Sequence, residues 1–286
     1  MLIDIYPLMT PFTVLIAVAL LLVLFSYVRR KISTSAFIGT LLLGVGIVVT
    51  LGRRYSYAGL LALMTFFFFG NMVTKYKYST KVKLGVAESN KGRRSIKNVL
   101  GNGLGPLIFA ILYADYHNTI FLLGFSGAVA TACADTFSTE IGQARGKPRL
   151  ITTLKKVPVG TNGGVSFSGF VGAMLGSGLV SIACLTFRLA IEPQLFFLFC
   201  FLSGFIGGIA DSILGATVED RKPLKLNKHH VNILATLFGG LFAIALCYTV
   251  LDYLRITQIS QLTLLLTTKA QYIIDYFIHQ IQTHIF

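Results

Sequence analysis

Acidic side chains at the ends of apolar segments are the residues whose type and position could do chemistry. Asp135 and Glu140 follow an uncharged run at residues 120–134, and Asp211 ends a second such run that reads Gly-Gly-Ile-Ala-Asp-Ser. A carboxylate at membrane depth costs roughly 3 kcal/mol unless it is paired, binds a metal or faces water, so these residues are candidates for function. The alternative is that they cap helices or pair with lysines of the loops.

The composition is that of a membrane protein. Only 13% of the 286 residues are charged, and the mean hydropathy is +0.73, whereas a soluble domain has about 25% charged residues. A net charge of +14 would suggest nucleic acid as the partner of a soluble protein. Here the cations cluster between apolar runs, so we expect cytoplasmic loops, contact with membrane lipid and no nucleic-acid partner. The four scattered cysteines have neither the spacing of a zinc site nor that of a disulfide framework.

Recurring apolar runs predict an all-α, polytopic membrane bundle of about eight helices, forming one transmembrane domain at residues 1–254. Glycine is abundant inside them, and the GxxxG at residues 172–176 would allow a close helix approach. The predicted spans lie at about residues 8–28, 33–51, 55–74, 98–114, 118–141, 164–187, 194–217 and 231–251.

Loop charge predicts the orientation of the bundle. The loops after the third, fifth and seventh predicted spans are rich in Lys and Arg, whereas the turns near Asp115 and Glu192 are nearly free of cations. Because cytoplasmic loops carry the excess of cations, the N-terminus is expected outside and the carboxylate-bearing span ends are expected at the cytoplasmic face. In a prokaryotic host this membrane would be the plasma membrane.

The C-terminal segment, residues 255–286, has a different pattern. Its apolar residues are spaced three or four apart with polar residues between them. This spacing is typical of an amphipathic helix that lies on the membrane surface or packs on a partner subunit. A homodimer is one expectation that follows.

Two loop stretches could bind anions. Arg93 and Arg94 precede the fourth predicted span, and Lys155 and Lys156 precede the stretch Val-Pro-Val-Gly-Thr-Asn-Gly-Gly-Val-Ser at residues 157–166. Backbone N–H groups of such a glycine-rich loop can cradle an anion before a helix, although the order of a Walker A motif is absent. The alternatives are a basic stretch that holds anionic lipid and a flexible turn.

Together these features predict a magnesium-dependent phosphate site at one membrane face. Carboxylates hold Mg²⁺, which usually bridges to substrate phosphates, while Lys and Arg neutralise the remaining charge. On an ideal helix Asp135 and Glu140 differ by about 140°, and Asp211 and Glu219 by about 80°. Asp135 and Glu140 therefore do not share one face. Either the helix breaks near Gly142, or the two carboxylates line different sides of a cavity.

Four ordered motifs resemble an integral membrane family that includes plant and cyanobacterial phytyl-phosphate kinases. They are Gly92-Arg93-Arg94 with Asn102-Gly103, residues 135–142, residues 157–165 and residues 211–215. The resemblance implies a kinase that converts an isoprenoid monophosphate, such as phytyl or geranylgeranyl phosphate, to its diphosphate. It implies CTP, or another nucleoside triphosphate, as the donor. The chain departs from the family pattern where Phe137 replaces Trp, Thr139 replaces Ser and Glu219 stands in place of a common Gln.

For that activity, the prenyl chain would lie in the apolar bundle while its phosphate meets the cytoplasmic charges. Asp135, Glu140 and Asp211 would hold Mg²⁺ or orient the acceptor phosphate. No general base is required, because the acceptor phosphate is already ionised at neutral pH. The expected phosphate- and substrate-binding residues are Arg93, Arg94, Asn102, Lys155, Lys156, Thr161, Asn162, Ser212, Glu219 and Asn232.

Two other functions remain open at this point. Intramembrane acids and many glycines are also typical of a transporter or flippase with an acidic coupling-ion site. A structural or lipid-binding membrane protein is the third possibility, but it leaves the buried acids unexplained.

Overall fold

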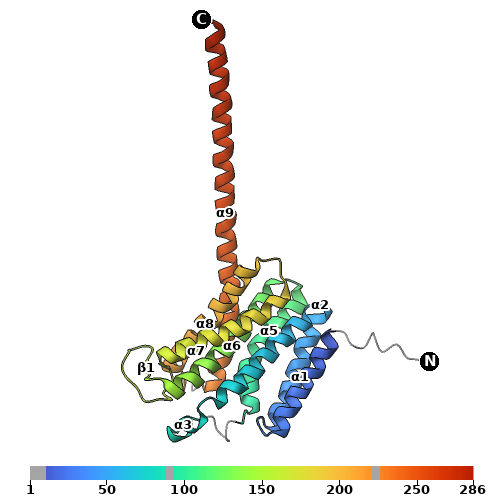
Figure 1. Cartoon of the computed structure of the whole chain (residues 1–286), viewed down its shortest axis with the longest axis vertical. Coiled ribbons are helices and arrows are strands. Elements are labelled where there is room, and N and C mark those ends of the chain that lie inside the picture. Colours follow the sequence, from blue (N-terminus) through green and yellow to red (C-terminus); the bar gives the residue numbers. More distant parts are fainter. Residues whose placement is uncertain (1–10, 88–92, 221–225, 286) are drawn as a thin grey trace, which may run out of the picture. The chain divides into compact units, whose positions relative to one another are not determined.

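The computed structural model describes residues 11–87, 93–220 and 226–285, and the side chains in these ranges except those of 257–268 and 270–285. In this part of the chain, seven helices are long and apolar enough to cross a membrane (Figure 1). The predicted all-α membrane bundle is therefore confirmed. These helices are α1 (Pro11–Val28), α2 (Thr34–Lys75), α5 (Ile96–Tyr116), α6 (Ile120–Arg145), α7 (Phe167–Cys184), α8 (Pro193–Thr217) and α9 (Lys228–Ile285).

Helix α2 is a pair of helical arms joined at a glycine. Its 42 residues would extend for about 63 Å as one straight helix, twice the roughly 30 Å of a bilayer core. At Gly52 the backbone turns to φ 62° and ψ −176°, a conformation that favours glycine. A Cβ placed on Gly59 would meet the side chains of Leu51 and Ile47, so the second arm runs back along the first. The arms, 34–51 and 53–75, match two of the eight predicted spans.

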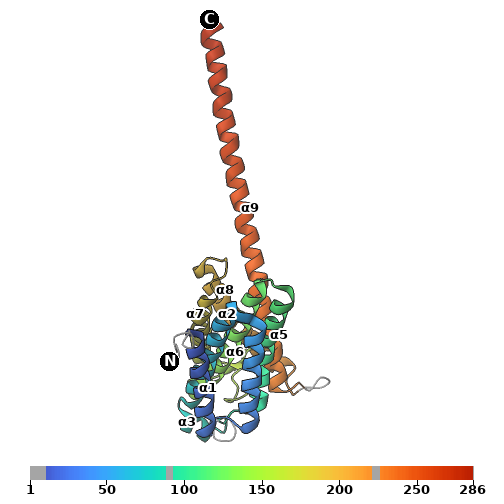
Figure 2. The same cartoon turned by 90° about the vertical axis from the view of Figure 1, so that its right-hand side faces the viewer.

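Helix α6 is the core of the bundle. Every residue from Leu122 to Ala134 is buried, because α5, α7 and α8 pack around it (Figures 1 and 2). The GxxxG of α7 makes a close approach: a Cβ on Gly176 would lie 2.6 Å from the carbonyl oxygen of Cys133. The hydroxyl of Thr131 also donates to the carbonyl of Ser203 on α8 at 3.2 Å. Small residues therefore let the backbones around α6 touch, as predicted.

The segment between α6 and α7 is built on a two-stranded antiparallel ribbon. Strand β1 (Arg149–Leu150) pairs with β2 (Gly164–Val165). The sixth span, predicted to start at about residue 164, starts three residues later, because residues 164–165 are extended. Helix α7 begins only after Ser166, whose hydroxyl caps it by accepting from the N–H of Gly169 at 3.1 Å.

Short elements complete the connections. Helix α3 (Tyr78–Lys83) follows α2, and the 3-10 helix η2 (Leu185–Phe187) follows α7. The alternating direction of the helices brings the ends of α6 and α8 and the starts of α5, α7 and α9 to the same end of the bundle (Figure 1). The candidate site residues are therefore gathered at that end.

The chain divides into two compact units, Met1–Ile244 and Ala245–Phe286. The second unit is helical, because α9 continues without a break to Ile285. The predicted boundary at residues 254/255, and the location of the C-terminal helix on a membrane surface or a partner, stay predictions. The predicted spans at residues 8–28 and 231–251 correspond to α1 and the first part of α9, although residues 8–10 lie outside the described residues.

Candidate functional site

A polar cavity of about 250 Å³ lies where α6, α7, α8 and α9 meet the β1–β2 connection. It brings together six of the residues predicted from the sequence. It is also lined by polar residues that were not predicted, chiefly Ser138, Thr139, Gln143 and Lys228. The predicted residues that line it are Asp135, Thr161, Asn162, Ser212, Asp211 and Glu219.

Two carboxylates from different helices face each other in this cavity. Asp211 of α8 interacts directly with Asp135 of α6, and the charges of Lys228 and Glu219 also act on it. The hydroxyl of Thr139 lies 3.5 Å from an Asp135 oxygen. Among the described residues, Oδ2 of Asp211 is buried and has no hydrogen-bond partner. An unsatisfied buried acceptor costs about 1–3 kcal/mol, so the pair is arranged for a cation or a donor supplied by a ligand.

The glycine-rich loop forms another wall of this cavity. Residues 159–164 all line the cavity. Gly160 and Gly163 have φ of 89° and 72°, the left-handed conformation that side chains disfavour. Two N–H groups of the loop are used inside it: that of Thr161 donates to the carbonyl of Pro158 at 3.3 Å, and that of Gly164 to the carbonyl of Thr161 at 2.9 Å. Loops with left-handed residues can present their other N–H groups to an anion. The predicted role of this loop in anion binding is compatible with its position.

Gly163 also fixes the loop against α8, which gives a testable prediction. A Cβ on Gly163 would lie 2.3 Å from that of Ala216, so Gly163→Ala is expected to lower the free energy of unfolding by about 1–3 kcal/mol. Gly85→Ala is the matched control, because Gly85 has a similar φ of 70° but open space around its Cβ position. Thermal unfolding in detergent compares them. Equal losses in the two variants would show that loop packing on α8 is unimportant.

Glu219 is the half-buried carboxyl at the end of the cavity. Burial raises the pKa of Glu219, and the neighbouring Asp220 and Asp135 add to the shift, while Lys228 opposes it. Because the folded state disfavours the ionised form, Glu219 lowers stability at pH values above its unfolded pKa. This contribution disappears in acid, where the carboxyl is protonated in both states.

Glu219→Gln is therefore expected to raise the melting temperature at neutral pH, with a gain that vanishes toward about pH 4. Thermal unfolding of the full chain at both pH values measures the difference. Asp115→Asn is the control, because Asp115 is an exposed acid on α5 outside this cavity. A lower melting temperature for Glu219→Gln at neutral pH would mean that its carboxylate is stabilised rather than strained.

Glu140 does not line the cavity. Helix α6 continues past Gly142 to Arg145, so the helix break considered from the sequence does not occur. Glu140 instead forms a buried ion pair with Lys81 of α3, and Lys81 Nζ also donates to the carbonyl of Thr74 at 2.7 Å. The pairing with a loop lysine, considered as the alternative role for the acids, holds for this residue.

The remaining predicted residues are distributed outside the cavity. Lys155 and Lys156 are exposed on the β1–β2 connection. Arg93 donates from Nε to the carbonyl of Ile32 at 3.0 Å, while Arg94 lines a separate apolar groove. Two further predicted residues connect helices: Nδ2 of Asn232 on α9 donates to Oδ1 of Asn102 on α5 at 3.0 Å.

Within the described residues, no group of three or more His, Cys, Asp and Glu side chains could hold a metal ion. The two cavity carboxylates alone are nevertheless a suitable set for Mg²⁺. This ion keeps several waters and is usually bound by one or two carboxylates plus substrate phosphates. The partnerless Oδ2 of Asp211 fits such a ligand.

Comparison with known proteins gives the family. The family model described as "Integral membrane protein DUF92" matches residues 17–240. An uncharacterized membrane protein of Methanocaldococcus jannaschii is 35% identical over 222 residues, covering 77% of this chain and 87% of that one. Protein VTE6, chloroplastic, of Arabidopsis thaliana is 35% identical over 200 residues, covering 67% of this chain and 59% of that one. No solved structure matches. The chain belongs to this integral membrane family, as its four motifs predicted.

Proposed function

We propose that this protein is an integral membrane kinase that transfers the terminal phosphoryl group of a nucleoside triphosphate, with CTP as the expected donor, to an isoprenoid monophosphate. The observation that carries the proposal is the cavity in which Asp135 and Asp211 face the glycine-rich loop 159–164. The 35% identity to Protein VTE6 and the resemblance of the motifs to phytyl-phosphate kinases support the isoprenoid acceptor.

The residues of the cavity have different roles in the proposed phosphoryl transfer. Backbone N–H groups of the loop 159–164, other than those of Thr161 and Gly164 that donate within the loop, bind phosphate oxygens of the donor, and Lys228 neutralises part of their charge. Asp135 and Asp211 would hold Mg²⁺, which neutralises phosphate charge when bound. Thr161, Asn162 and Ser212 supply neutral hydrogen bonds.

The reaction needs no base on the protein. An oxygen of the acceptor monophosphate forms the new bond to the γ-phosphorus, and the bond from that phosphorus to its bridging oxygen breaks. A nucleoside diphosphate leaves with the bond electrons. Because the acceptor is already an anion, the protein has to position two charged groups and neutralise them. The polar groups gathered at one end of the bundle can both position and neutralise the two phosphates. We propose that this end faces the cytoplasm.

Transfer of labelled γ-phosphate to geranylgeranyl or phytyl monophosphate tests the proposal. Purified full-length protein is assayed with CTP, ATP, GTP and UTP, with Mg²⁺ or with EDTA. We expect a lipid diphosphate that forms only with the metal. If protein with a cooperative unfolding transition transfers to no prenyl phosphate from any nucleotide, the kinase is excluded, and ion-coupled transport in liposomes becomes the function to assay.

A further inference from the structure

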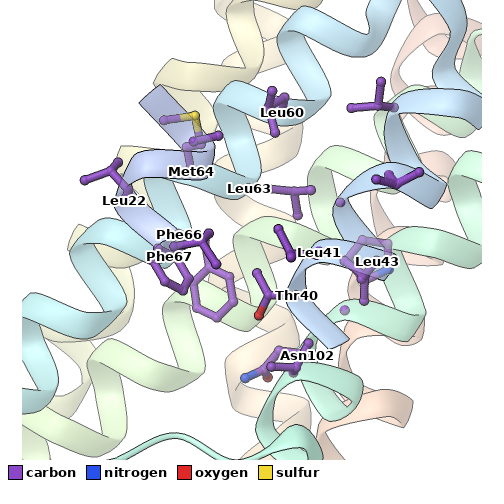
Figure 3. A pocket seen from close by; sticks show the side chains of 18 of the residues that line it. Leu22, Thr40, Leu41, Leu43, Leu60, Leu63, Met64, Phe66, Phe67 and Asn102 are labelled. Atoms are coloured by element: carbon purple, nitrogen blue, oxygen red, sulfur yellow. The ribbon is translucent and has the colours of Figure 1, made fainter. Parts of the chain in front are cut away.

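A second cavity, of about 260 Å³, is an apolar groove along α5. It is lined by residues of α1, both arms of α2 and α5, by Val129 of α6, and by Ile32 and Arg94 of the connecting segments. Figure 3 shows Leu41 and Leu63 converging on it from the two arms of α2, with Asn102 at one end and Leu60 at the other. Six residues of the first arm, from Thr40 to Val48, line the groove, and this stretch extends about 12 Å along the helix axis.

The polarity of the groove is concentrated at one end. Arg94 is the one charged residue among the described side chains that line it, and Asn98 and Asn102 are the amides. These three residues belong to the start of α5 and the segment before it. They therefore lie at the end of the bundle that also holds the polar cavity. A groove with apolar walls and a cationic end matches a single hydrocarbon chain that carries an anionic head.

Arg94 is held in place by its neighbours. Its backbone N–H donates to the carbonyl of Lys31 at 2.9 Å, and its carbonyl accepts from Ser33 at 3.0 Å. Its guanidinium lies 5.7 Å from the ring centre of Phe66 and 3.4 Å from the hydroxyl of Thr74. The cation is therefore positioned before any ligand binds, which lowers the entropy cost of binding.

Three further cations, Lys31, Lys75 and Arg29, lie near one another outside the groove. Burial lowers the pKa of Lys31, and the nearby Lys75 and Arg29 lower it further. Lys31 is the residue whose carbonyl binds the backbone of Arg94. Through this backbone contact the cations add to the positive potential around Arg94, which favours a phosphate over a neutral head group.

We propose that the groove binds the hydrocarbon chain of a single-chain lipid monophosphate, and that Arg94 holds its phosphate at the groove's polar end. This inference rests on the proposed function, because it assigns the place of the acceptor in the same reaction. It also makes the groove a determinant of chain length. Side chains deep in it, such as Val48 and Leu60, would meet the end of a longer chain.

Gly44 offers a way to fill the groove without disturbing the bundle. It lines the groove, and a Cβ placed on it meets nothing within 4 Å, so Gly44→Phe puts a ring into open space. Leu42→Phe is the matched control, because Leu42 lies on the same arm, is 69% exposed and does not line the groove. Thermal unfolding of both variants shows that they are folded.

Binding of tritiated geranylgeranyl phosphate to the full chain in nanodiscs, without nucleotide, is the measurement. We expect Gly44→Phe to weaken binding by about ten-fold or more, and Leu42→Phe to change it by less than about two-fold. Arg94→Gln should weaken binding of the phosphate by about ten-fold but leave binding of geranylgeraniol within about two-fold, and Arg94→Lys should restore part of the loss.

Unchanged binding in Gly44→Phe would place the chain elsewhere and overturn the proposal. Competition by phosphatidic acid as effective as that of geranylgeranyl phosphate would also overturn it, because the groove would then hold ordinary membrane lipid. Failure of the kinase is distinguishable from these results. If the lipid phosphate binds in the groove but no phosphoryl group is transferred, the groove remains the lipid site and the kinase reaction is excluded. If Gly44→Phe transfers the phosphoryl group at the wild-type rate, the kinase reaction stands and the groove is not its acceptor site.

Discussion

Asp211→Asn is expected to reduce phosphoryl transfer by about 10²–10³-fold or more, because it removes one of two charges that face the transferring group. The asparagine has nearly the same shape and loses the repulsion between Asp211 and Asp135. The melting temperature without metal should therefore not fall. Steady-state transfer of labelled phosphate, measured beside thermal unfolding, separates the loss of chemistry from a loss of fold.

The same variant tests the metal site without an activity readout. Mg²⁺ and nucleotide should raise the melting temperature of the wild-type chain, since a ligand at 100 times its dissociation constant adds about 2.7 kcal/mol. They should not do so in Asp211→Asn. Glu192→Gln is the control, because Glu192 is an exposed carboxylate at the other end of α8. Full activity and full metal stabilisation in Asp211→Asn would remove Asp211 from the mechanism.

Lys81→Met is expected to destabilise the protein by about 3–5 kcal/mol, since it leaves the buried carboxylate of Glu140 without its counter-charge. The side chains of Lys81 and Glu140 are 0% and 9% exposed, so water cannot replace the lost partner. The melting temperature in detergent measures the effect. Lys83→Met, two residues along the same short helix, is exposed and should change it little.

A double variant decides what Glu140 does. Lys81→Met combined with Glu140→Met removes both charges and should recover most of the lost stability. If Glu140 only anchors α3 to α6, this double variant also keeps phosphoryl transfer near the wild-type rate. A folded double variant with transfer reduced by about 10²-fold would instead return Glu140 to the metal or phosphate site.

The spans were predictable because uncharged length is a direct requirement of the bilayer. Even the hairpin of α2 could be anticipated, since Arg53 and Arg54 follow Gly52 and divide the two apolar runs. The error at the start of α7 has a local cause. Gly163 and Gly164 are apolar enough to extend an uncharged run, but they belong to the turn and strand that close the loop over the cavity.

The sequence predicted the two acidic residues and the glycine-rich loop of the site, but not the lysine that lines it. The similar placing of Asp135 and Asp211 near the ends of two spans that run in the same direction was enough to bring them together. The lysines of the loops have no comparable fixed position relative to the ends of the spans. Nothing in the sequence ranks Lys228 above Lys155, because the choice depends on where α9 begins relative to the cavity. The partner of Glu140 was equally hidden, since Lys81 is 59 residues away.

The order of the ion-pair partners along the chain has a consequence for biosynthesis. The ribosome makes the N-terminal part first, so Lys81 is already present when α6 emerges with Glu140. One carboxylate of α6 can thus be neutralised as this helix is inserted into the lipid bilayer. Among the described residues, the charged groups that line the cavity with Asp135 are Asp211, Glu219 and Lys228, and all three are translated later than Asp135. The Lys81–Glu140 pair can therefore orient α6 in the membrane before the last helices close the cavity around Asp135.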